Sequence, residues 1–370
     1  MNTPDDQDLF QKIYEAQAMQ DGPAKCSVLE EIVRLADTQN DIDAGYEART
    51  ALVQASNFSG YPEISLVAFT WCLAQFDQHP DRFDLDDLLW KYKWIVNSLL
   101  DFPQISMRQM DDALEDLRKR YERAGYGDYA YHLLRLRRAL TIGDDANLPR
   151  YYELWKKASR DRMSDCLACV QNLEVRYAVR LQDDEKAWEL AQPLLNGRMR
   201  CQQVPHTTYG HLLKPLVRLQ WLDKAVRLHK TGYRMIASNA TFLADVGKHM
   251  NFLSVTDNLA RASRLLEKHL IWALQTAALD DRFHFYLACQ FLLERMRIAD
   301  QQSLKLRLPR LFPLYQRSGQ YELADLHAWF GQESQELAGR FDQRNGTDAF
   351  ASDIAALQKF HALAKPYPFR

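Results

Sequence analysis

Four residues of the types that bind soft metal ions lie in two short groups in the middle of the chain. Cys166 and Cys169 are separated by two residues, and Cys201 and His206 are separated by four. Thiolate sulfur and imidazole nitrogen are the usual ligands of structural zinc, in sets of four around a tetrahedral ion. The spacing therefore predicts one structural zinc ion held by Cys166, Cys169, Cys201 and His206, provided that the fold brings the two groups together.

A helical hairpin is the element that must do this. Residues 165–181 and residues 183–195 each have the pattern of a helix that begins at an aspartate. The antiparallel return of the second helix would carry Cys201 back to the first pair of cysteines. Pro205 is suited to the start of the next helix, with His206 in its first turn. We expect all four ligands at the same end of the hairpin.

Other interpretations of these residues stay open. The cysteines could instead be packing residues in a helix interface, and His211 or His229 could replace His206 as the fourth ligand. A thioredoxin-like redox role is less favoured, because no βαβ pattern surrounds the pair. The other three cysteines are isolated within apolar segments and are expected to be buried: Cys26, Cys72 and Cys289.

Composition limits the class of protein. The chain has 370 residues, a net charge of −2, and 47% hydrophobic and 26% charged residues. Such a balance does not favour a dedicated nucleic-acid binder. The N-terminal residues lack the pattern of a signal peptide, and no run of 18 apolar residues occurs. We therefore expect a cytoplasmic protein that binds neither membrane nor nucleic acid.

Helical periodicity extends along nearly the whole chain. Apolar residues recur at the i, i+3, i+4, i+7 spacing of amphipathic helices, and polar breaks of two to six residues separate the segments. Glycine (14) and proline (13) are scarce, which also favours helix. This pattern predicts an all-α fold of about 16 to 19 helices, most of them antiparallel neighbours, and no strand.

Small residues recur where a second helix would begin after a short turn. These alanines are Ala130, Ala187, Ala225, Ala262 and Ala324. Closely packed helices need a small side chain at such a position. With Tyr209, Leu212 and Leu216 before Ala225, and Leu308, Leu311 and Tyr315 before Ala324, the chain resembles a tetratricopeptide-repeat protein. The resemblance implies an α-solenoid of antiparallel hairpins, a right-handed superhelix whose concave face binds a protein or peptide.

The repeats are degenerate. Ala187 and Ala225 are 38 residues apart, Ala225 and Ala262 are 37, and Ala262 and Ala324 are 62. An irregular α-solenoid of another kind is therefore the alternative. We expect a helical cap at residues 1–39, repeats at 40–341, and a linker, a last helix and a tail at 342–370.

No familiar catalytic motif is present in the sequence. It contains no phosphate-binding loop, dinucleotide-binding glycine motif, nucleophile elbow or His-Glu-x-x-His zinc motif. The favoured hypothesis is a non-enzymatic adaptor with no cofactor other than the zinc ion. The alternatives are a peptide-responsive regulator, similar to the repeat-containing regulators of bacteria, and an enzyme that uses the cysteine and histidine cluster.

Overall fold

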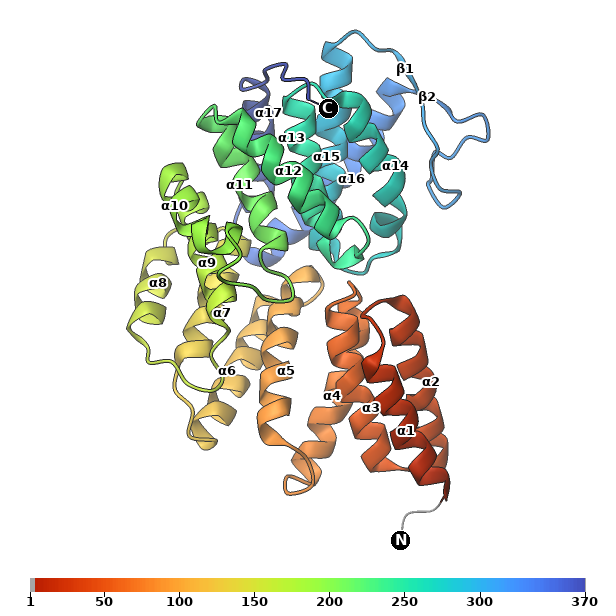
Figure 1. Cartoon of the computed structure of the whole chain (residues 1–370), viewed down its shortest axis with the longest axis vertical. Coiled ribbons are helices and arrows are strands. Elements are labelled where there is room, and N and C mark those ends of the chain that lie inside the picture. The colour runs from red at the N-terminus through yellow and green to blue at the C-terminus, as the bar shows by residue number, and fades with distance from the viewer. Residues whose placement is uncertain (1–3, 370) are drawn as a thin grey trace. The chain divides into compact units, whose positions relative to one another are not determined.

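The computed structural model describes residues 4–369, and their side chains from Leu9 onward (Figure 1). This part of the chain forms seventeen α-helices, two 3-10 helices and two short strands. The prediction of an all-α fold with about 16 to 19 helices is confirmed. The chain forms two compact units: unit 1 contains residues 4–134 and 154–164, and unit 2 contains residues 135–153 and 165–369.

Unit 1 is a set of sequential helix pairs around its own apolar core. Its helices are α1 (Pro4–Ala18), α2 (Pro23–Gln39), α3 (Ile42–Asn57), α4 (Pro62–Gln78), α5 (Leu85–Ser98), η1 (Leu99–Asp101) and α6 (Met107–Arg123). Each α-helix from α1 to α6 packs against the next, and α3 also contacts both α1 and α5. One layer of alternate helices, α1, α3 and α5, is thus covered by α2 and α4.

Local sequence signals set the helix ends in unit 1. The side chain of Asp41 accepts a hydrogen bond from the backbone N–H of Ala44 at the start of α3. Ser106 and Gln109 form a reciprocal capping box at the start of α6. These contacts satisfy N–H groups that have no partner within the helix.

Unit 2 is also built from helices that pack against their neighbours in the sequence. Helices α7 (Tyr129–Ile142) and α8 (Leu148–Lys157) are each divided between the two units. The others are α9 (Leu167–Arg180), α10 (Asp184–Leu195), α11 (His206–Arg218), α12 (Leu222–Ile236), η2 (Ala240–Phe242), α13 (Leu243–Val255), α14 (Leu259–Gln275), α15 (Leu279–Ile298), α16 (Leu323–Asn345) and α17 (Ala349–His361). Helices α9, α11, α13 and α15 contact one another in turn, and α10, α12, α14 and α16 pack beside them.

The predicted small residues are buried in the tight hairpins. Ala187, Ala225 and Ala262 are all 0% exposed, and Ala130 is 2% exposed. Ala324, however, is exposed, and Leu323 and Leu326 face the core instead. The register predicted around Ala324 is wrong, because α16 does not follow a tight helical turn.

A short hairpin of strands takes the place of that turn. Strands β1 (Ser303–Lys305) and β2 (Gln320–Glu322) pair antiparallel, with Leu304 opposite Tyr321. The expectation of no strand is therefore wrong for these six residues. Figure 1 shows the segment projecting from the helices around it. The segment also accounts for the 62-residue interval between Ala262 and Ala324.

The repeat pattern predicts a helix that contains Leu308, Leu311 and Tyr315 before Ala324. The structure has this non-helical segment there instead. Leu308 is buried, but Leu311 is 63% exposed and Tyr315 is 38% exposed. Pro309 and Pro313 lie among them, and proline disrupts a helix interior. The alternation Leu304, Leu306, Leu308 is typical of a strand and is the signal for it in the sequence.

Helices α16 and α17 and a short tail form the C-terminal part of the chain. Helix α16 continues to Asn345, so only residues 346–348 separate it from α17. Gly346 ends α16 in the left-handed conformation, with φ of 67°. The division into a cap at residues 1–39, repeats at 40–341 and a C-terminal segment at 342–370 stays a prediction.

None of the helices in residues 4–369 combines the length and the apolar character that crossing a bilayer requires.

Candidate functional site

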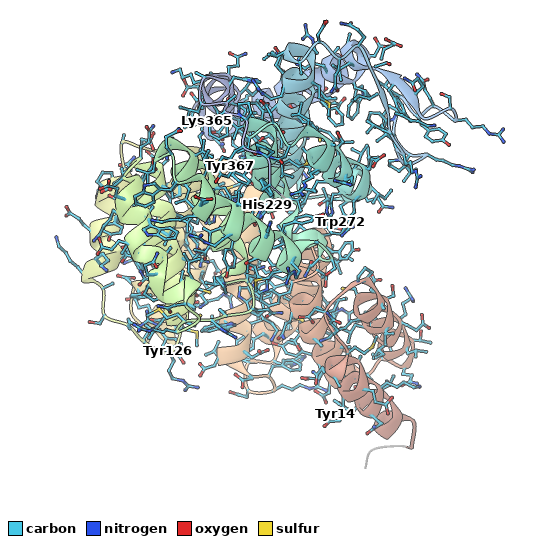
Figure 2. All side chains as sticks on the ribbon, turned by 45° about the horizontal axis from the view of Figure 1, so that its top comes forward. Tyr14, Tyr126, His229, Trp272, Lys365 and Tyr367 are labelled. Carbon is cyan, nitrogen blue, oxygen red and sulfur yellow. The ribbon has the colours of Figure 1, made fainter. Side chains whose placement is uncertain are left out.

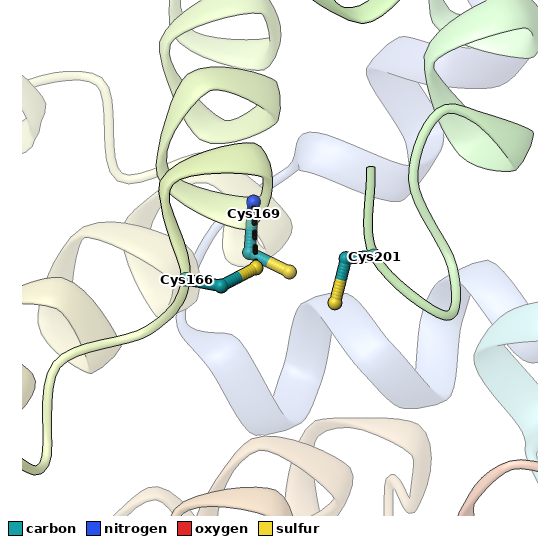
Figure 3. A group of neighbouring side chains, drawn as sticks. All are labelled: Cys166, Cys169 and Cys201. Carbon is teal, nitrogen blue, oxygen red and sulfur yellow. Dashed lines mark hydrogen bonds between the residues drawn. The ribbon is translucent and has the colours of Figure 1, made fainter. Parts of the chain in front are cut away.

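Three of the four predicted metal ligands lie together in unit 2. The sulfur atoms of Cys166, Cys169 and Cys201 are all within 4.8 Å of one another. Figure 3 shows Cys166 and Cys169 at the start of α9, with Cys201 facing them from the loop after α10. Cys166 and Cys201 are exposed and Cys169 is partly buried, so the group lies at the surface of its unit.

The start of α9 places the first two thiols. Cys166 is the N-cap residue, and its sulfur accepts a hydrogen bond of 3.5 Å from the backbone N–H of Cys169. The preceding residue is held by an ion pair between Asp165 and Arg137 at 2.7 Å. The predicted helix start at Asp165 is thus displaced to Leu167. A helix N-terminus favours an anion, and therefore favours thiolate over thiol.

The return of the hairpin places the third thiol. Helix α10 begins after Asp183, whose side chain accepts from the backbone N–H of Lys186, and it packs against α9 as predicted. Beyond it, the backbone N–H of Cys201 donates to the carbonyl of Val204 at 2.9 Å. This closes a tight loop immediately before α11, and the loop holds Cys201 opposite α9.

Hydrogen bonds within the cluster shift the pKa values of two of the thiols in opposite directions. The Cys169 thiol, then the Cys166 thiol and the backbone N–H groups of Gln202 and Gln203, favour a thiolate on Cys201 and lower its pKa despite partial burial. The hydrogen bond to Cys201, followed by burial, raises the pKa of Cys169. Between Cys169 and Cys201, the thiolate is therefore favoured on Cys201.

None of the three candidate histidines belongs to this group. No histidine, aspartate or glutamate among the described residues joins the three sulfur atoms at the same distance. His206 begins α11 as predicted, but its ring stacks on Phe242, with 5.5 Å between the ring centroids. His211 lies 3.3 Å from the ammonium of Lys248, and His229 lies 3.0 Å from His249.

The three thiols fit the demands of a soft metal ion. Tetrahedral zinc has Zn–S bonds of about 2.3 Å, which places neighbouring sulfur atoms about 3.8 Å apart. Sulfur atoms that already lie within 4.8 Å of one another would need only a small contraction. The arrangement could thus hold a metal ion such as zinc on three protein ligands, with room for a fourth on the exposed side.

A second candidate site is a polar cavity of about 720 Å³ in unit 1. Helices α1, α3 and α5 line it, together with Lys25 of α2 and the loop before α5. The lining residues are Phe10, Gln17, Lys25, Asp43, Tyr46, Glu47, Thr50, Ala51, Gln54, Arg82, Phe83, Asp84, Asp87 and Lys91. These residues come from separated helices and form no motif, so the sequence contains no signal for this site.

The seven tyrosine and tryptophan residues of α7, α8, α11 and α12 divide between the core and partly exposed positions. Four are buried: Tyr129, Tyr151, Trp155 and Tyr209. Three are partly exposed: Tyr131, Tyr152 and Tyr233. None of the seven lines the cavity of unit 1. The aromatic residues of that cavity are instead Phe10, Tyr46 and Phe83.

The tail after α17 lies extended on unit 2. The backbone N–H of Lys365 donates to the carbonyl of Val255 at 3.0 Å, and that of Tyr367 donates to Thr256 at 3.1 Å. The side-chain amide of Asn258 donates to the Tyr367 carbonyl. Figure 2 labels Lys365 and Tyr367 of this tail, together with His229 of α12. The turn between α13 and α14 thus binds an extended segment through backbone atoms.

Neither the family models nor the curated proteins compared with this sequence give a match.

Proposed function

We propose that this chain is a non-enzymatic scaffold of the tetratricopeptide-repeat type that binds a protein or peptide partner and is braced by one structural zinc ion. The observation that carries the proposal is the cavity of unit 1. Three alternate helices, α1, α3 and α5, line this cavity together. A surface that continues from one helix pair to the next suits an extended segment.

The C-terminal tail gives an internal example of such binding. Residues 365–369 lie on the turn between α13 and α14, with backbone hydrogen bonds and an aromatic ring as anchors. The ring of Phe369 lies 5.9 Å from that of His229, and the guanidinium of Arg261 lies 4.7 Å from the same phenyl ring. Backbone bonds combined with aromatic anchors are a common mode of peptide recognition.

Zinc at the three cysteines would serve structure rather than catalysis in this proposal. Cys166, Cys169 and Cys201 connect the start of α9 to the loop before α11, so one ion would fix three consecutive helices. With a fourth ligand the site would be closed, as in structural zinc sites. His206 remains a candidate for that position only if its ring leaves Phe242.

A second candidate is a peptide-responsive regulator. The division of the chain into two compact units favours it, because a regulator of this type combines an N-terminal helical bundle with repeats. A change in the radius of gyration on peptide addition, measured by X-ray scattering, would support this role. An unchanged scattering curve at saturating peptide would favour the simple adaptor.

The test of the scaffold proposal uses the full zinc-loaded chain and a positional-scanning library of hexapeptides. Fluorescence anisotropy measures binding, and hydrogen–deuterium exchange locates it. We expect saturable binding with slower exchange in α1, α3 and α5. Absence of binding to every pool would contradict the proposal, and thiol-dependent turnover of a test ester would favour the enzyme alternative.

A further inference from the structure

The charges around the cavity of unit 1 are unevenly matched. Its three cations are Lys25, Arg82 and Lys91, and its four carboxylates are Asp43, Glu47, Asp84 and Asp87. This excess of negative charge favours a cationic ligand only if other protein groups already bind the three cations of the cavity. The contacts of each cation decide this point.

All three cations are held by protein groups. The ammonium of Lys25 donates to the carbonyls of Gln17 and Met19 and to Asp21, so its three N–H groups each have an acceptor. Lys91 forms an ion pair with Asp87 one turn before it on α5. These cations neutralise neighbouring carboxylates and have little capacity left for a ligand.

Arg82 is also committed to a carboxylate. Its Nε and Nη2 donate to the two oxygens of Asp43 at 2.6 and 2.8 Å. Such a bidentate pair uses the fork of the guanidinium and both oxygens of its partner. Arg82 and Asp43 therefore neutralise each other, and neither is the preferred partner of a charged ligand.

Two carboxylates of the cavity have no cationic partner among the described residues. Among the described residues, Glu47 and Asp84 form no ion pair; Glu47 accepts from the amide of Gln17 at 3.2 Å, and Asp84 caps α5 by accepting from the backbone N–H of Asp87. Both side chains are exposed at the cavity. A cation entering the cavity would meet them first.

Two aromatic residues of the cavity, Tyr46 and Phe83, directly precede these carboxylates in the sequence. The rings of Tyr46 and Phe83 are stacked, with 3.7 Å between their centroids. Tyr46 is 5% exposed, and its hydroxyl has no hydrogen-bond partner among the described residues. Burial, followed by the Cys72 thiol and the nearby carboxylates, raises the pKa of Tyr46, so the phenol stays protonated. A buried polar group without a partner is costly, and the phenol oxygen can accept a hydrogen bond from a cationic N–H group as well as donate one.

We propose that this cavity binds a peptide segment through a lysine or arginine side chain, with Glu47 and Asp84 as the carboxylates that receive the cation. The inference rests on the proposed function, since it names the ligand class of the same site. Long basic side chains combine an apolar stem with a charged tip, which matches two stacked aromatic rings in a cavity that also contains carboxylates without an ion pair. A volume of 720 Å³ is within the range of about 300–1,000 Å³ for ligand pockets and leaves space for residues on either side.

The experiment compares library pools that differ at one position of the hexapeptide. Pools with lysine or arginine fixed at that position should bind at least about tenfold more tightly than pools with norleucine or glutamate. Their affinity should fall as the salt concentration rises, because the contacts at the rim are exposed. Equal affinity of basic, neutral and acidic pools would overturn the inference and leave the scaffold proposal intact, whereas no binding by any pool would contradict both.

Variants identify the carboxylates. Glu47→Gln together with Asp84→Asn should lower the affinity for basic pools by about tenfold and leave neutral pools unchanged. Asparagine also caps helices well, so α5 should remain folded, which circular dichroism checks. Asp112→Asn is the matched control, because Asp112 is an exposed carboxylate of α6 outside the cavity. Unchanged affinity in the double variant, or an equal loss in the control, would overturn the assignment.

Discussion

Gly232 of α12 faces Tyr209 of α11 so closely that a side chain at position 232 has no space. A Cβ atom built on Gly232 would lie 2.4 Å from the Cβ of Tyr209 and 3.2 Å from the Cε1 of His249. Real Cβ atoms do not approach other carbon atoms so closely. The glycine therefore sets the distance between these two helices, and three helices meet around it.

Gly232→Ala should destabilise the protein although alanine is the better helix former. Overpacking of this kind typically costs about 1–3 kcal/mol. Gly339→Ala is the matched control, since Gly339 lies inside α16 and a methyl group added there would have no atom within 4 Å. That change should stabilise by roughly 0.5–1 kcal/mol. Urea unfolding measures both, and equal effects would contradict the close approach.

The same substitution should destabilise the protein at Ala225 and have little effect at Ala324. Ala225→Leu places three extra carbon atoms in a site with 0% exposure and should cost about 1–3 kcal/mol. Ala324→Leu adds them at an exposed position of α16 and should change the stability by less than about 0.5 kcal/mol. Thermal melts of the two variants test this register, and a tolerated Ala225→Leu would show that the α11–α12 hairpin packs differently.

The contrast between these alanines shows how far sequence predicts this fold. Helical periodicity is local, so the helices were predictable, and short turns predicted antiparallel pairs. The alanine pattern holds where a tight turn joins two helices, as at Ala187 and Ala225. It fails at Ala324, because residues 299–322 form strands and an irregular segment that the repeat pattern does not describe. Close approaches such as that of Gly232 to Tyr209 depend on tertiary packing and have no signal in the sequence alone.

The candidate metal site was also predictable in part. Cys166, Cys169 and Cys201 belong to one hairpin, so the spacing along the chain was sufficient to bring them together. His206 depends on the direction of a side chain at a helix start, and its ring is taken up by Phe242. The cavity of unit 1 combines residues from separated helices, and only the packed structure brings them together.

Protein purified without a chelator should contain close to one zinc ion per chain. Cys201→Ser removes one thiolate and should lower both the zinc content and the melting temperature, because metal binding stabilises the folded state. Zinc should also be released as the pH falls, since protons compete for the thiolates. Elemental analysis and a chromogenic chelator measure these effects.

His206→Ala tests the fourth ligand. Its zinc content should equal that of the wild type if His206 stays on Phe242, and should fall if the ring turns to the metal. A wild-type protein that is free of zinc, with three thiols that react freely, would contradict the metal site.

Buried histidines should make the stability depend on pH in the mildly acidic range. Burial, followed by the charges of Arg261 and Lys230, lowers the pKa of His229 to about 4. Burial, followed by the charge of Lys268, lowers the pKa of His269 to about 3. In the unfolded chain both have a pKa of about 6.5, so below that pH the unfolded state binds more protons. Their contribution to stability is thus complete above about pH 6.5 and is lost as the pH falls toward about 4 and 3. Urea unfolding from pH 7.5 to 4.5 should show this loss.

His269→Gln separates this effect from other groups that titrate in acid. Glutamine can still accept a hydrogen bond from the Tyr233 hydroxyl, which lies 3.0 Å from the Nε2 of His269, but it does not titrate. Between about pH 5.5 and 4.5, each proton bound only by the unfolded state lowers the free energy of unfolding by about 1.4 kcal/mol per pH unit. The slope for the variant should be smaller by about this amount, while zinc release and the carboxylates affect both proteins equally. Parallel curves for the two proteins would mean that His269 takes up its proton without unfolding, and that its ring is less enclosed than its 0% exposure indicates.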